Sequence, residues 1–288
     1  MTELSPPEIT LGQIIVGFAF LLILAVSGAI WAWMASRRKR GEAVLAFQPR
    51  EPIQWHPGVL AISLGWIGLQ VGASVLGMIS GWFSPPAEDP APTHETQVVI
   101  GVVLSAAINL GVWAWLIAAL WWQSPARRLA DYGITFYRLP QQVFLGTMGA
   151  VASALPVFLA ALVVAPFRSE ETQHVLLQFV RGEIGILAIA AVAFIAVVAA
   201  PLMEELIFRV VLQGWLTTVL PERQALPIAA AVFAAVHGWP DAIPLFPLAL
   251  ILGIVYHRTH RYYTVVVLHA LFNATNLAFA VLSVESSR

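Results

Sequence analysis

The sequence contains no cysteine among its 288 residues. This absence excludes disulfide bonds, thiolate nucleophiles and cysteine-ligated metal sites. Charge is scarce as well: 11 % of the residues are charged, whereas a soluble domain carries about 25 %. No tract of lysine and arginine resembles a nucleic-acid-binding patch, so we expect no nucleic-acid partner.

Apolar residues dominate instead, at 59 % of the chain with a mean hydropathy of +0.80. A segment of about 20 apolar residues crosses the hydrocarbon core of a bilayer. The sequence therefore predicts an all-α fold, a polytopic transmembrane helical bundle of about eight spans surrounded by membrane lipid. The candidate spans are 12–35, 58–83, 98–122, 143–165, 184–200, 202–219, 225–239, 241–256 and 262–284.

Two local features shape this prediction. Pro201 divides the long apolar stretch 184–219, and proline removes a backbone hydrogen bond, so we expect a kinked or broken helix there. The N-terminus, MTELSPPEIT, lacks the positive region of a secretory signal peptide, so we expect the first apolar segment to be retained as a span.

Basic residues predict the orientation, because they accumulate in cytoplasmic loops. They follow the first and third spans and precede the last, whereas the loop 84–97 has none. We expect a multi-pass protein of the cell (inner) membrane with its N-terminus outside. The basic residues are Arg37, Arg38, Lys39, Arg40, Arg50, Arg127, Arg128, Arg138, Arg258 and Arg261.

The second span carries two small-residue motifs, Gly68-x-x-x-Gly72 and Gly77-x-x-x-Gly81. Glycines four apart allow two helix backbones to approach closely in lipid. The motifs are compatible with a homodimer through these faces, and packing inside the same chain is the more common use of such a motif.

The polar residues divide the chain into two parts. Residues 1–183 keep their charges almost wholly in loops, and we interpret them as N-terminal transmembrane helices of unknown role. Residues 184–288 carry ionisable side chains inside apolar segments, each of which costs about 2.5–3.5 kcal/mol to insert and so indicates function. We predict a catalytic helical core here, around a polar intramembrane cavity. The set comprises Glu204, Glu205, Arg209, His237 and His269, with Asn273 and Asn276 as uncharged companions.

The spacing of these residues distinguishes their roles. Glu205 and Arg209 are four apart on a helix, so they can pair on one face and support the structure. Glu204 points away from that face and lacks a local cation, which suits a general base. His269 and Asn273 also share a face, which suits binding of a developing oxyanion. Each residue alone has a structural explanation, but together they favour a site.

Other hydrolytic chemistries are missing. There is no His-Glu-x-x-His zinc motif and no Gly-x-Ser-x-Gly elbow. The three aspartates lie outside the clearest spans, so an intramembrane aspartyl pair is absent as well. Water is therefore the expected nucleophile.

Three motifs then occur in order: Glu204-Glu205-x-x-x-Arg209, Phe233-x-x-x-His237 and His269-x-x-x-Asn273. Together they resemble the signature of the CPBP family, which includes the type II CAAX prenyl endopeptidases and the bacterial Abi-type membrane proteases. The resemblance covers about 184–284, with Val210 where the family commonly has glycine.

The resemblance implies a membrane-embedded endopeptidase, glutamate-dependent or metalloprotease-like. Glu204 would activate water with the help of His237, and His269 and Asn273 would stabilise the oxyanion. Glu205 and Arg209 would support the site. Two possibilities for the cofactor stay open: one divalent metal such as zinc on Glu204, His237 and His269, or none.

We therefore expect an intramembrane endopeptidase acting on a membrane-associated, optionally prenylated, peptide or protein. Two other classes use the same residues. A proton-coupled transporter could relay protons through Glu204 and the two histidines, although such proteins usually repeat their polar site in both halves. A non-catalytic immunity or scaffold protein on the same fold is the third, and an unpaired glutamate would bring it no benefit.

Overall fold

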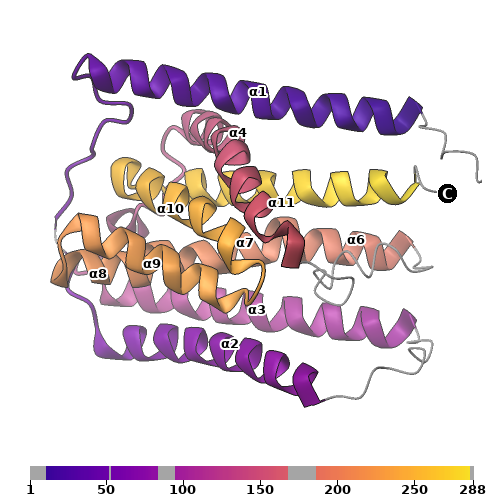
Figure 1. The fold of residues 1–288 in the computed structure, drawn as a ribbon. Coiled ribbons are helices and arrows are strands. Elements are labelled where there is room, and N and C mark those ends of the chain that lie inside the picture. The colour runs from indigo at the N-terminus through magenta and orange to yellow at the C-terminus, as the bar shows by residue number, and fades with distance from the viewer. Residues whose placement is uncertain (1–10, 52, 84–94, 168–185, 286–288) are drawn as a thin grey trace, which may run out of the picture.

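A computed structural model describes residues 11–51, 53–83, 95–167 and 186–285, and throughout these ranges the regular structure is helical, with no strand. The predicted all-α class is confirmed. Four helices precede the C-terminal part: α1 (Leu11–Lys39), α2 (Pro57–Phe83), α3 (Glu95–Gln123) and α4 (Leu139–Val164). Three more close the chain: α9 (Glu222–Val236), α10 (Ala242–Thr259) and α11 (Tyr262–Glu285). Figure 1 shows most of them running along a common direction.

Between these groups lies one unbroken helical run from Ile186 to Val219. It comprises α6 (Ile186–Phe194), the π-helical segment η3 (Ile195–Ala199), α7 (Ala200–Glu205), a second π-helical segment η4 (Leu206–Gln213) and α8 (Gly214–Val219). The helix is therefore not broken at Pro201, and the two candidate spans 184–200 and 202–219 form one helical stretch. The wider turn just before Pro201 shifts the hydrogen-bond register, so a residue without an N–H fits into a continuing helix.

Six helical stretches of the described chain are long and apolar enough to cross a membrane. They are Leu11–Lys39, Val103–Gln123, Leu139–Phe167, Ile189–Val219, Ala242–Thr259 and Tyr262–Leu282. The helix α2, with an apolar part at Pro57–Gly72, runs for 27 residues, whereas α9 has 15 residues, fewer than a full crossing needs. The chain is a polytopic membrane protein whose helix α9 is shorter than a full span.

A proline in α4 explains how α1 is attached to the bundle. Pro156 has no N–H, so the carbonyl of Ala152, four residues earlier, loses its partner within the helix. The Ser27 hydroxyl and the Trp31 indole of α1 both donate to this carbonyl, at 3.0 and 2.8 Å. In lipid a free carbonyl is costly, so this pairing joins α1 to α4.

Close packing of α4 against α11 supports the helix that carries His269. A Cβ on Gly146 would lie 2.7 Å from the carbonyl oxygen of Thr264, and one on Gly149 would collide with Leu268. These two glycines let the backbones of α4 and α11 approach closely. The helix α4 of the N-terminal part thus packs closely on α11 of the C-terminal part.

The glycines of α2 behave differently. Among the described residues, a Cβ on Gly68 or Gly72 would meet nothing within 4 Å, so none of them packs on this face. Gly77 and Gly81 lie further along α2, beyond the residues whose side-chain surroundings the structure describes. A homodimer through these motifs stays a prediction.

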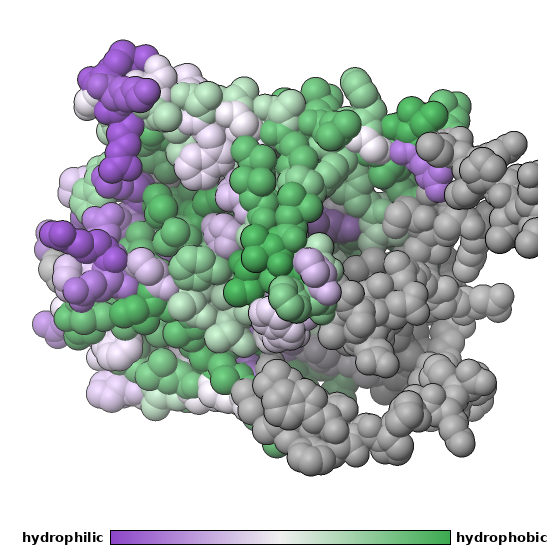
Figure 2. All heavy atoms as spheres, viewed as in Figure 1, coloured by the Kyte–Doolittle hydropathy of each residue, from purple (hydrophilic) through white to green (hydrophobic). Residues whose placement is uncertain are grey.

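The basic clusters gather at one end of the bundle. Arg37, Arg38 and Lys39 end α1, and Arg258 and Arg261 flank the short link from α10 to α11. Figure 1 places the end of α1, the start of α2 and the α8–α9 corner at the same end. Figure 2 shows hydrophilic residues collected there and apolar residues along the sides, as expected for a protein embedded in lipid.

Candidate active site

Three helices bring one carboxylate and two imidazoles together near the middle of the bundle. Glu204 lies on α7, His237 follows the last residue of α9, and His269 lies on α11. The Oε2 atom of Glu204 is 3.8 Å from His237 Nε2 and 3.9 Å from His269 Nε2. Glu204 and His269, which are 65 positions apart in the chain, therefore lie close together, as the sequence predicts.

The other nitrogen of each ring explains this orientation. His237 Nδ1 lies 2.8 Å from the backbone carbonyl of Phe233, one helical turn earlier. A carbonyl only accepts hydrogen bonds, so Nδ1 carries the proton. In the neutral ring Nε2 then presents a lone pair to Glu204. The Phe233-x-x-x-His237 spacing thus sets the tautomer of the histidine.

Glu205 has the same function for His269. Its Oε1 lies 2.8 Å from His269 Nδ1, and its Oε2 accepts from Arg209 Nε at 2.9 Å. Glu205 and Arg209 are fully buried, and His269 is nearly so. The pair predicted from the i, i+4 spacing therefore forms, and it also reaches a second helix and orients an imidazole.

Phe233 lies among these groups. Its ring is fully buried, 4.7 Å from the Arg209 guanidinium carbon, and its centroid is 4.7 Å from that of His237. Within the described residues, the two terminal nitrogens of Arg209 have no hydrogen-bond acceptor. The aromatic face takes the place of one, since a ring attracts a desolvated cation.

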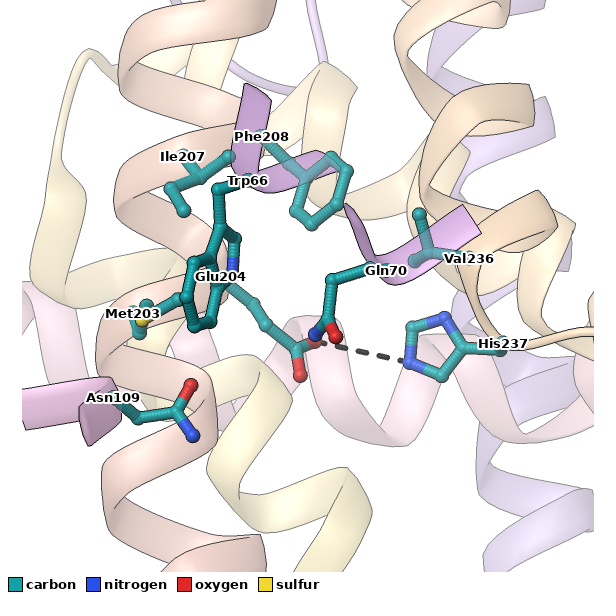
Figure 3. A pocket seen from close by; sticks show the side chains of 9 residues that line it. All are labelled: Trp66, Gln70, Asn109, Met203, Glu204, Ile207, Phe208, Val236 and His237. Carbon is teal, nitrogen blue, oxygen red and sulfur yellow. Dashed lines mark ion pairs between the residues drawn. The ribbon is translucent and has the colours of Figure 1, made fainter. Parts of the chain in front are cut away.

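A cavity of about 210 Å³ opens beside Glu204. Figure 3 shows Glu204, His237 and Gln70 pointing into it, with the Glu204–His237 ion pair drawn as a dashed line. The Glu204 side chain is 24 % exposed, yet its Oε2 has no hydrogen-bond partner in the described part of the chain. The cavity is lined by Trp66, Gln70, Asn109, Met203, Glu204, Ile207, Phe208, Val236 and His237.

The Oε2 atom of Glu204 is buried between the two imidazoles, so the exposure of the Glu204 side chain comes from its other atoms. Both distances to the imidazoles exceed the 2.7–3.2 Å range typical of a direct N–H···O hydrogen bond. The part of the Glu204 side chain that lines the cavity is where a water molecule would reach the carboxylate, with His237 beside it.

The two asparagines of α11 lie differently. Asn273 Nδ2 donates to the carbonyl of Ala196, inside the π-helical segment η3, at 2.8 Å. It does not line the cavity at Glu204, and its second N–H is the one that remains for a substrate. Asn276 is exposed and donates to Phe272 of its own helix, so it does not link two helices.

Sequence reasoning missed several residues of the site because it considered mainly ionisable groups. Gln70 and Asn109 lie within apolar spans of the N-terminal part, and an amide in such a span is itself a signal. Tyr262 was missed as well. Its buried hydroxyl donates to the carbonyl of Leu202, two residues before Glu204, and accepts from Trp113 Nε1 at 3.0 Å.

A divalent metal matches the chemistry of the three donors, since histidine and glutamate are common zinc ligands. The arrangement of the three side chains matches a metal site less well. Within the described ranges, no group of three or more His, Cys, Asp or Glu side chains is arranged to hold a metal ion. We therefore derive no step through a metal.

The fold and the site define a class: an integral membrane protein of bundled helices in which a glutamate and a histidine line a cavity and a second histidine lies buried beside them. Residues 186–275 match the family model described as type II CAAX prenyl endopeptidase Rce1-like, which confirms the resemblance carried by the three motifs. This is a family of proteases, which supports an enzyme acting on a membrane-associated protein. No curated protein and no solved structure matches the chain.

Proposed function

We propose that this protein is an intramembrane endopeptidase that hydrolyses a peptide bond with water activated by Glu204 and His237. The observation that carries the proposal is the position of Glu204, which lines the cavity while its Oε2 lies buried between two imidazole nitrogens without a hydrogen bond to any described residue. The substrate is a peptide or protein held at the membrane. Prenylated C-terminal peptides are the first to test, because the matched family is named for them.

The proposed reaction needs no group beyond this chain and water. Glu204 takes a proton from water as its oxygen attacks the scissile carbonyl carbon, with His237 holding the water in line. The C–N bond then breaks, and the proton passes from Glu204 to the departing amine. General acid–base catalysis of this kind contributes about 10²–10⁴-fold.

We assign stabilisation of the oxyanion to residues of α11. To donate to it, His269 Nε2 must carry a proton in addition to that on Nδ1, and Glu205 is the carboxylate that stabilises such an imidazolium. Asn273 lies outside the cavity lining, and we assign it only its second N–H as a further donor to bound substrate. Donors already held in place stabilise the charge without reorganising during the reaction.

The charge distribution supports a location and an orientation for the protein. We place the protein in the cell (inner) membrane, with the basic end of the bundle in the cytoplasm and the N-terminus outside. The cavity then lies within the depth of the bilayer, and a substrate reaches it from the membrane rather than from bulk water.

The test is hydrolysis of lipid-anchored peptides, prenylated and acylated, in proteoliposomes. We expect Glu204→Gln to lower kcat by about 10²–10⁴-fold and His237→Ala to lower it by a similar factor. Glu42→Gln, which changes an exposed carboxylate on a loop, is the control. Equal cleavage by Glu204→Gln and wild type would refute the assignment. Substrate flux in sealed vesicles without cleavage would favour a transporter.

A further inference from the structure

A second cavity, of about 330 Å³, adjoins the one at Glu204. The two share Trp66, Gln70 and Asn109 as lining residues, so they lie side by side and together make up a hollow along α2 and α3. The second cavity is completed by residues of α3 alone: Gly101, Leu104, Ser105 and Ile108. We call this hollow the α2–α3 groove.

The packing of its two walls shows where the groove leads. α2 packs on η4 and α9, whereas α3 packs on α6, η3 and α7. Both helices thus pack on the helical run that carries Glu204, α3 along its first part and α2 along its later part, and they also pack on each other. Leu104 and Ile108 remain 59 % and 47 % exposed, so the groove opens at the outer, lipid-facing surface of the bundle.

Polar atoms line this otherwise apolar groove. Asn109 Nδ2 donates to the Ser105 carbonyl at 2.8 Å, which leaves its Oδ1 able to accept. The amide of Gln70 makes no hydrogen bond with any described residue, and Figure 3 shows it pointing into the cavity of Glu204. A polar group in an apolar membrane segment is costly unless it gains a partner.

The chemistry of these groups identifies the occupant. A lipid acyl chain offers no hydrogen bonds, so amides in the groove would only weaken its binding. An extended peptide presents one N–H and one C=O per residue, and in lipid each needs a partner. Gln70 can donate and accept, and Asn109 can accept. Among the described residues, a Cβ on Gly101 would meet nothing within 4 Å, so these residues leave room for a backbone beside α3.

We propose that the α2–α3 groove holds the substrate chain in an extended conformation on a lateral path to Glu204, with Gln70 and Asn109 hydrogen-bonding to its backbone. This inference rests on the proposed endopeptidase function and assigns to the N-terminal part its role: substrate positioning. Gln70 and Asn109 are positioning residues, because they act on the bound chain and not on the water.

The kinetic test replaces each amide by an apolar side chain of similar size. Gln70→Leu and Asn109→Leu should each raise KM for a prenylated peptide by about tenfold, the effect of one lost hydrogen bond, with kcat changed much less. Leu69→Gln, next to Gln70 on an exposed face, is the control and should leave KM unchanged. Unchanged or lower KM in the two leucine variants would show a lipid groove and overturn the proposal.

The binding test does not need catalysis. Because the chain has no cysteine, a single introduced cysteine can carry a benzophenone label at one chosen position. In the Glu204→Gln background, Leu104→Cys should cross-link the prenylated peptide several-fold more than Val103→Cys. Val103 is similarly exposed, at 55 %, but does not line the groove. Excess unlabelled peptide should abolish the difference.

The outcomes separate the two proposals. Cross-linking at Leu104 without cleavage by the wild-type enzyme would support the groove and refute the endopeptidase. Cleavage that depends on Glu204, with equal cross-linking at Leu104 and Val103, would support the endopeptidase and overturn the groove.

Discussion

Glu205 accepts a hydrogen bond from Nδ1 of His269 at 2.8 Å, although 64 positions separate the two residues. The same carboxylate holds Arg209 through its other oxygen. One buried group therefore neutralises a cation on its own helix and orients an imidazole on another. This directs Nε2 of His269 toward Glu204, whereas Glu205 itself faces away from the cavity.

The Glu205–Arg209 pair predicts a separation of stability from activity. Glu205→Gln leaves the buried guanidinium without its carboxylate, which we expect to cost about 3–5 kcal/mol of unfolding free energy. The double variant Glu205→Gln/Arg209→Met should recover most of that stability while activity stays at least about tenfold low, because His269 has lost its carboxylate partner. Thermal unfolding in detergent and peptide hydrolysis measure the two effects. Recovery of both together would show a purely structural role.

The hydroxyl of Tyr262 is expected to position the Glu204 helix. Tyr262→Phe leaves the Leu202 carbonyl and the Trp113 indole without their partner, at a cost of about 1–3 kcal/mol. Activity should fall with it. Tyr263→Phe is the matched control: Tyr263 is only partly buried and stacks on Phe136. Equal effects of the two substitutions on thermal unfolding would contradict this role.

Removal of metal should leave the reaction intact if water is activated by Glu204 and His237 alone. We expect hydrolysis to persist after treatment with EDTA and dialysis, with no stoichiometric zinc in the purified protein by elemental analysis. Activity that is lost on chelation and restored by zinc would instead assign Glu204, His237 and His269 as metal ligands.

His260 should make stability depend on pH. Burial, reinforced by Arg50, lowers the pKa of His260 from 6.5 to about 4. Its Nε2 lies 3.1 Å from the Asp131 carbonyl and its Nδ1 lies 3.2 Å from an Arg50 nitrogen, so the neutral ring is already satisfied. Between these two pKa values the unfolded chain binds more protons. The free energy of unfolding should therefore fall as the pH is lowered from about 6.5 to 4, by on the order of 2–3 kcal/mol.

The matched variant for this effect is His260→Asn. Asparagine tolerates the left-handed backbone conformation of this position, where φ is 47°. Chemical denaturation of both proteins between pH 4 and 7 isolates the contribution of the histidine, because other titrating groups are common to the two. Parallel pH profiles would exclude His260 as the cause.

Much of this molecule could be predicted from the sequence, because lipid penalises charge so strongly. Apolar runs located the helices to within a few residues, apart from the run 186–219, where π-helical turns on both sides of Pro201 keep the helix continuous. The same penalty identified Glu204, His237 and His269, since each would be costly without a function. The i, i+4 spacing predicted the Glu205–Arg209 pair.

Tertiary structure alone decided which helices meet at the site. Glycine spacing gave no indication that Gly146 and Gly149 pack on α11 while Gly68 and Gly72 face open space. Nor did any pattern connect Gln70 and Asn109 with Glu204, because uncharged amides are cheap enough in a span to carry little signal. Hydropathy measures the free energy of placing each residue of a helix in lipid. Which neighbouring residues offset that free energy depends on how separate helices pack. This packing is made by contacts between residues far apart in the chain, so a local sequence pattern does not show it.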